Sequence, residues 1–120
     1  MFGFFRSNSP DFTYDPGQAV SDLKADRISV IDIREPSEVK TTGKAEGALH
    51  VPLAALRMKA DPASPEQLEE FRSGKPVVLY CASGSRSQIA VRMLRHMGLE
   101  EVYNLGGLAH WEMAGGVIGR

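Results

Sequence analysis

The 120-residue chain has little cysteine, little net charge and no long hydrophobic run. Its single cysteine excludes an internal disulfide, and three widely spaced histidines form no zinc-ligand pattern, so no metal site is predicted. Fourteen basic and fifteen acidic residues leave a formal charge of −1, which argues against nucleic acid or a membrane surface as partner. Phosphate-loop and dinucleotide motifs are missing, so no cofactor is predicted. The remaining class is an ordinary soluble globular protein, 42% hydrophobic and 24% charged.

The beginning of the sequence predicts a tail in front of one domain. Residues 1–10 are expected to be a flexible tail and residues 11–120 a single domain, because a chain of this length fits one domain. Phe2, Phe4 and Phe5 form an apolar run too short for a signal peptide or a membrane span. Since a free thiol fits a reducing compartment, we expect a cytoplasmic location.

Short apolar runs alternate with helix signatures along the chain. Residues 28–33 and 76–80 are almost uninterrupted in apolar character, as expected for strands buried on both faces of a sheet. Because strands alternate with helices throughout, the sequence predicts an α/β sandwich with a mostly parallel central sheet flanked by helices. The other expected elements are helices at about 15–25, from Pro36, at 64–72, at 87–97 and after Gly107 through Met113, and strands at 48–51 and 101–105.

The most informative segment follows the expected strand at 76–80. Cys81 comes at the carboxyl end of that strand, and the small and polar residues 82–87 lead into a helix. In open α/β sheets, ligands bind beyond the carboxyl ends of the strands, where backbone amides and helix N-termini converge. Such amides lower the pKa of a thiol from about 8.5 to roughly 3.5–7.5. We therefore expect Cys81 to be a nucleophilic thiolate inside a ring of main-chain donors that is open to solvent.

Two residues of this segment also have plainer interpretations. A free cysteine is often buried and inert, which is the alternative for Cys81, although the small and polar residues after it favour a reactive thiol. Arg86 lies in the first turn of a helix, where a cation opposes the macrodipole at a cost of about 0.3–1 kcal/mol. A bound anion would relieve this conflict. The alternative is that Arg86 points to solvent, where screening makes the cost negligible.

Several segments together resemble the rhodanese family, over roughly residues 12–116. The similar signatures are residues 32–38 (Asp-Ile-Arg-Glu-Pro-Ser-Glu), 43–52, the cysteine loop at 81–87 and 106–111 (Gly-Gly-Leu-Ala-His-Trp). One departure is Lys44-Ala45, where the family more often has a histidine and an isoleucine. The resemblance implies a rhodanese-like three-layer sandwich.

The resemblance also implies an enzyme, a sulfurtransferase of the thiosulfate sulfurtransferase type. The Cys81 thiolate would take a sulfane sulfur from a small anionic donor such as thiosulfate, become a persulfide, and pass the outer sulfur to cyanide or a thiol. Because the chain has no second cysteine, the sulfur acceptor must be another molecule. A partner protein is one such acceptor. The implied site comprises Cys81 as nucleophile, a substrate-binding loop of Ala82, Ser83, Gly84, Ser85, Arg86 and Ser87, and Asp32 and Arg34 as supporting residues.

The other residues of these signatures have mainly structural interpretations. Asp32 is expected to bind loop backbone amides or Arg34, rather than to transfer protons. Trp111 is expected in the core because of the large area that it must bury. Solvent-facing positions are expected for four more residues: Glu35, Glu38, His50 and His110.

Two rival functions remain open at this stage. A dual-specificity phosphatase on a rhodanese-like fold also uses a cysteine thiolate in an amide-lined loop, but such a phosphatase is expected to have five residues between cysteine and arginine. Cys81 and Arg86 have four between them, which predicts a tighter ring. The other rival is a non-enzymatic interaction or regulatory module whose loop only docks a partner. The presence of Cys81 favours the enzyme.

Overall fold

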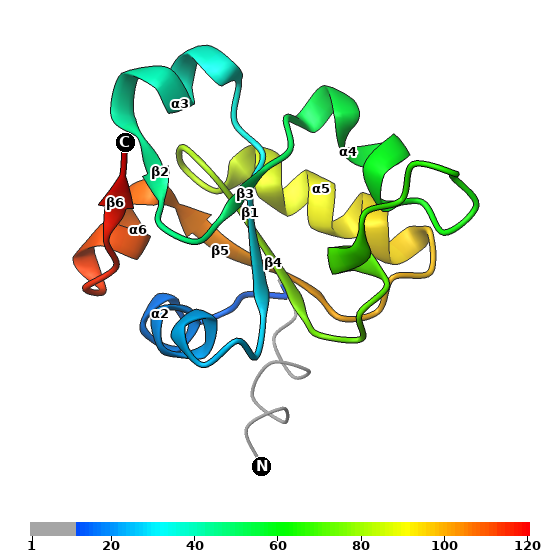
Figure 1. Cartoon of the computed structure of the whole chain (residues 1–120), viewed down its shortest axis with the longest axis horizontal. Coiled ribbons are helices and arrows are strands. Elements are labelled where there is room, and N and C mark those ends of the chain that lie inside the picture. Colours follow the sequence, from blue (N-terminus) through cyan, green and yellow to red (C-terminus); the bar gives the residue numbers. More distant parts are fainter. Residues whose placement is uncertain (1–11) are drawn as a thin grey trace.

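A four-stranded parallel sheet forms the centre of the molecule (Figure 1). The computed structural model describes residues 12–120, so the tail predicted at 1–10 lies outside the described residues. In the order β3, β1, β4, β5, the strands are Leu49–His50, Ser29–Asp32, Val77–Cys81 and Val102–Gly107. All three neighbouring pairs run parallel. The carboxyl ends of the strands, including Cys81 at the end of β4, therefore meet at one edge of the sheet.

The two central strands are buried on both faces, as their apolar runs predict. Every residue of β1 and β4 is buried. Because successive side chains of a strand point to opposite faces, Val78 and Tyr80 join one core cluster whereas Leu79 and Cys81 join the other. Cys81 is thus directed toward the cluster that also contains Leu94.

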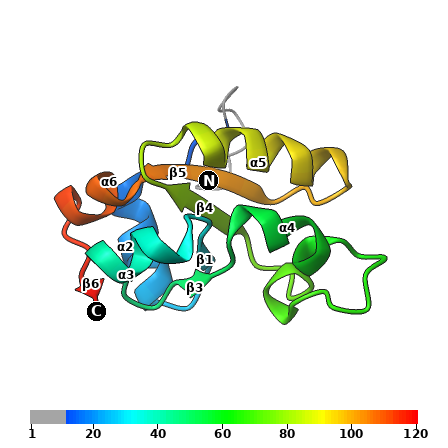
Figure 2. The same cartoon turned by 90° about the horizontal axis from the view of Figure 1, so that it is seen from above.

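Helices cover both faces of the sheet and complete three layers. Ala19 of α2 (Pro16–Lys24) and Trp111 of α6 (Leu108–Met113) belong to one core cluster. Leu56 of α4 (Leu53–Ala60) and Val91 of α5 (Ser85–His96) belong to the other. Figure 2 shows α5 running alongside β5. The predicted three-layer α/β sandwich is confirmed. Within residues 12–120, none of the helices combines the length and apolar character needed to cross a membrane.

A small antiparallel pair, which the sequence analysis did not predict, holds the carboxyl terminus. Strand β2 (Lys44–Ala45) pairs with β6 (Ile118–Gly119) just after helix α3 (Pro36–Thr42). Gly43 precedes β2 with a φ of 79°, and a Cβ there would lie 2.5 Å from the carbonyl oxygen of Gly119. Only glycine fits that backbone approach. Lys44 and Ala45, the two residues that depart from the pattern of the rhodanese family, thus form strand β2 of this pair.

The segment between β3 and β4 differs from the prediction. The helix expected at 64–72 is wrong, because the chain forms turns and one short 3-10 helix, Glu69–Phe71. The Ser64 hydroxyl does accept a hydrogen bond from the Glu66 amide, but it closes a turn rather than beginning an α-helix. Helix α4 was not predicted, since its N-cap is Pro52, which offers no side-chain oxygen to cap the first amides.

Candidate active site

The loop after β4 folds back over the sulfur of Cys81. Gly84 has a φ of 106°, in the left-handed region, and helix α5 begins at the next residue, Ser85. A Cβ at Gly84 would lie 3.1 Å from the Cα of Gly106, so both the conformation and the close approach favour glycine. The turn directs the Gly84 amide at the Cys81 Sγ, with an N–Sγ distance of 3.0 Å.

Several donors converge on this sulfur. Besides the Gly84 amide, the Ser87 hydroxyl lies 3.4 Å from the Cys81 Sγ. Burial by itself raises the pKa of the Cys81 thiol, but the Ser87 hydroxyl and the amides of Ser87, Gly84 and Ser83 outweigh it, so that the pKa is lowered from its ordinary value. The predicted ring of main-chain donors therefore exists, and it favours the thiolate.

The expected opening to solvent is wrong, because Cys81 is 0% exposed. Its side chain points to the opposite face of the sheet from that of Tyr80, into the cluster that contains Leu79 and Val91. The folded-back loop covers it there. The sulfur consequently has apolar neighbours on one side and hydrogen-bond donors on the other. Ala82 and Ser83 of the loop are exposed, so a reagent has to approach through the loop.

A buried polar network that the sequence analysis missed supports the loop. The Asn104 side chain accepts from the Ser87 hydroxyl (2.7 Å) and the Gly106 amide (2.9 Å), and donates to the carbonyl of Gly84 (3.1 Å). Asn104 is only 9% exposed within β5. An amide side chain inside the apolar run of a predicted strand is the signal that could have identified it, because a buried polar group requires partners.

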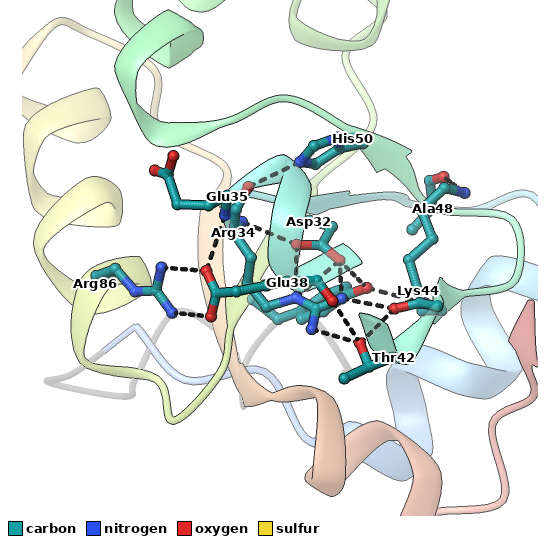
Figure 3. Close-up of polar contacts among 12 residues, drawn as sticks. Asp32, Arg34, Glu35, Glu38, Thr42, Lys44, Ala48, His50 and Arg86 are labelled. Atoms are coloured by element: carbon teal, nitrogen blue, oxygen red, sulfur yellow. Dashed lines mark hydrogen bonds and ion pairs between the residues drawn. The ribbon is translucent and has the colours of Figure 1, made fainter. Parts of the chain in front are cut away.

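Arg86 is paired within the protein, contrary to both interpretations of the sequence. Its Nη1 and Nη2 donate to the two carboxylate oxygens of Glu38, at 2.8 and 3.0 Å (Figure 3). These bonds, together with one from the Glu35 amide, lower the pKa of Glu38 to about 2. The same pairing raises the pKa of Arg86, to which the nearby Cys81 sulfur also contributes. The expectation that Glu38 merely faces solvent is therefore wrong.

Asp32 binds Arg34, one of its predicted partners, in a buried ion pair. The two side chains are 0% and 3% exposed, with an Nη2–Oδ2 distance of 2.8 Å. The Arg34 amide and the Tyr80 hydroxyl also donate to Asp32, and Arg34 donates to the carbonyl of Gly43. Figure 3 shows the further contact from Arg34 to the Thr42 hydroxyl. Burial lowers the pKa of Arg34, but Asp32 more than offsets this and the net shift is upward. The pair holds the chain where it passes from α3 into β2.

Three further residues of the signatures can be placed. Trp111 is 3% exposed, which confirms the prediction that it lies in the core. His50 is half-buried and its Nε2 donates to the carbonyl of Arg34 (2.7 Å), whereas the Nδ1 of the exposed His110 accepts from the Gly107 amide (2.9 Å). His110 is thus exposed, as expected, whereas His50 lies only partly at the surface; each histidine also fixes a backbone group, a role that the sequence analysis did not predict.

The fold and the loop place the chain in the class of three-layer α/β domains that carry a cysteine at the carboxyl edge of a parallel sheet. Residues 15–114 match the family described as the rhodanese-like domain. That match covers most of the chain, and the chain belongs to the rhodanese-like family.

The relatives and solved structures that are similar to this chain differ in their described activities. YqhL, an uncharacterized protein of Bacillus subtilis, is 38% identical over 86 residues, which are 71% of this chain and 61% of that protein. A sulfurtransferase of Allochromatium vinosum is 33% identical over 89 residues, 73% of this chain and 75% of that protein. A tRNA uridine(34) hydroxylase of Pectobacterium carotovorum is 32% identical over 81% of this chain but only 29% of its own length.

A solved structure from Rhodopseudomonas palustris has a TM-score of 0.79 and 34% identity, covering 89% of this chain and 83% of that one. It is described as a protein of unknown function and a possible tyrosine phosphatase. The chain spans less than two thirds of the length of YqhL and less than one third of the hydroxylase. Similarity alone therefore establishes the rhodanese-like domain and leaves the reaction to be inferred from the site.

Proposed function

We propose that this chain is a sulfurtransferase that carries a sulfane sulfur on Cys81. The observation that supports this most strongly is the convergence of the Gly84 amide and the Ser87 hydroxyl on a sulfur whose pKa is lowered. A thiolate attacks electrophilic sulfur, whereas a thiol does not, so a lowered pKa increases reactivity at neutral pH. The sulfurtransferase among the relatives has the same described activity.

The proposed reaction has two steps. The Cys81 thiolate attacks the outer sulfur of a donor such as thiosulfate, the sulfur–sulfur bond of the donor breaks, and sulfite leaves with the bonding electron pair. The product is an anionic persulfide, which the loop amides stabilise as they stabilise the thiolate. An external acceptor, either cyanide or a thiol of a small molecule or protein, then removes the outer sulfur and regenerates the thiolate.

The proposal assigns roles to the loop and a location to the reaction. The amides of residues 82–87 hold the anion, and Arg86 lies at the edge of the site where the leaving group departs. Asp32 and Arg34 maintain the shape of the neighbouring segment without touching sulfur. We place the reaction in the cytoplasm, because reducing compartments keep a lone thiol free for chemistry.

Intact-mass spectrometry after incubation with thiosulfate tests the proposal. We expect the wild type to gain the mass of one sulfur atom, the Cys81→Ser variant to gain nothing, and cyanide to remove the added sulfur. Aryl phosphates should be hydrolysed negligibly, because the loop has four residues between Cys81 and Arg86. Hydrolysis of aryl phosphates without sulfur uptake would support a phosphatase instead. Absence of hydrolysis, together with no sulfur uptake from thiosulfate or from a less charged sulfane-sulfur donor, would support a docking module.

A further inference from the structure

Arg86, a cation that interacts with the Cys81 sulfur, is already paired with a carboxylate. Both terminal nitrogens of Arg86 donate to Glu38, in a two-bond arrangement that matches the shapes of guanidinium and carboxylate. The two side chains are about one third exposed, at 34% and 32%, so solvent screens the pair only in part. In the loop that covers Cys81, the positive charge of Arg86 is therefore balanced before any substrate binds.

Glu38 is held in place by more than Arg86. Its Oε1 also accepts the backbone amide of Glu35, at 2.9 Å, in the first turn of α3 (Figure 3). To release Arg86 by rotation, the carboxylate would have to give up this helix-capping bond as well. An anion that approaches Cys81 past Arg86 thus encounters a balanced ion pair and the negative Cys81 thiolate, rather than an unpaired Arg86.

From this arrangement we propose that Glu38 is a specificity-determining residue that makes the site discriminate against dianionic sulfur donors such as thiosulfate. The favoured donors carry one negative charge or none, as thiosulfonates and neutral alkyl persulfides do. This inference rests on the proposed sulfur transfer by Cys81. A general anion site would favour donors with more negative charge. Here the choice among donors is assigned to the carboxylate of Glu38, which neutralises Arg86.

Thiosulfate and methanethiosulfonate are a matched pair of donors. Each carries a terminal sulfur on a sulfonyl sulfur, but a methyl group replaces one charged oxygen in methanethiosulfonate. In both reactions the thiolate of Cys81 forms a bond to the terminal sulfur while the bond from that sulfur to the sulfonyl sulfur breaks. The leaving group takes the electron pair as sulfite, with two negative charges, or as methanesulfinate, with one. No oxidant, reductant or proton is needed, and the cysteine becomes an anionic persulfide in each case.

The experiment compares the rates at which the two donors add sulfur to Cys81 in single-turnover reactions. Glu38→Gln removes the charge but keeps an oxygen that accepts from the Glu35 amide and Arg86. We expect this variant to increase the ratio of the thiosulfate rate to the methanethiosulfonate rate by about threefold to tenfold, the size expected for one partly screened charge at close range. Glu100→Gln is the matched control, because Glu100 is an exposed residue that precedes β5 at the opposite edge of the sheet. It should leave the ratio unchanged.

A second readout separates charge selection from sulfur transfer. Iodoacetamide and iodoacetate are similar in size but differ by one charge, and both alkylate a thiolate. In Glu38→Gln, the rate of Cys81 alkylation by iodoacetate relative to iodoacetamide should also increase by about threefold to tenfold. If sulfur is transferred while both ratios stay at the wild-type value, charge selection by Glu38 is refuted and the sulfurtransferase remains. If no donor transfers sulfur but the alkylation ratio changes as expected, charge selection stands and the sulfurtransferase is refuted.

Discussion

Replacing Ser87 with alanine removes a side-chain hydroxyl that lies within hydrogen-bonding distance of the Cys81 sulfur. Its Oγ lies 3.4 Å from the Cys81 Sγ and 2.7 Å from the Asn104 Oδ1, and a hydroxyl has only one proton to donate. A hydrogen bond to a charged group contributes about 1.5–3 kcal/mol, and we take the low end because the distance to sulfur is long. Since one pKa unit corresponds to about 1.36 kcal/mol, the pKa of Cys81 should increase by about one unit.

The assay is the pH dependence of thiolate ultraviolet absorbance, checked against the pH dependence of alkylation by iodoacetamide. At a pH below the Cys81 pKa of both the wild type and Ser87→Ala, a one-unit increase in this pKa should reduce the alkylation rate about tenfold. Ser83→Ala is the control, because the Ser83 hydroxyl lies 3.2 Å from that of Ser85 and only the retained Ser83 amide acts on the sulfur. A pKa change of less than about 0.3 units in Ser87→Ala, or an equal change in both variants, would show that the hydroxyl serves Asn104 alone.

Three more predictions concern stability. The pKa of Glu38 is lowered from 4.5 to about 2 in the folded protein, so its negative charge stabilises the fold at neutral pH. This stabilisation is lost as the pH decreases through about 2. In urea titrations, the difference in unfolding free energy between wild type and Glu38→Gln should therefore shrink between about pH 5 and pH 2. Gly84→Ala should cost about 1–3 kcal/mol in urea unfolding and reduce persulfide yield, since alanine is strained at a φ of 106°. Asp32→Asn should cost about 3–5 kcal/mol, because it leaves the buried Arg34 charge uncompensated, and a cost below about 1 kcal/mol would contradict this.

Features that depend on neighbouring residues could be predicted from the sequence. Strands β1 and β4 were found because their apolar runs are buried on both faces, and the turn after Cys81 because small residues and Gly84 follow a strand. Helix α2 was found because Asp15 caps it, with its side chain accepting from the Gln18 amide at 2.9 Å. In each case the residues that determine the structure lie within a few positions of one another.

Features that depend on distant residues were missed. Glu38 and Arg86 are 48 positions apart, and a glutamate in the first turn of a helix is favoured by the dipole whether or not it has a partner. Asn104 and Ser87 are 17 positions apart and meet only because β5 lies beside β4. The segment at 64–72 contains a capping signal, but the chain there forms turns and a short 3-10 helix instead of an α-helix. These outcomes follow from tertiary packing, which local patterns do not encode.

For Cys81 the structure combines burial with hydrogen-bond donors that lower the pKa of the thiol. Burial raises the pKa of a thiol because it removes water from the thiolate, and inside an apolar core alone this would leave the cysteine inert. At the last position of β4 the sulfur keeps apolar neighbours on the side of the sheet, while the turn at Gly84 replaces water with fixed donors on the other side. In the sulfur transfer that we propose, these fixed donors would need no reorganisation when the negative charge passes from thiolate to persulfide. The exposed fraction of Cys81 is therefore a poor guide to the pKa of its thiol, and the direction of the neighbouring amides is a better guide.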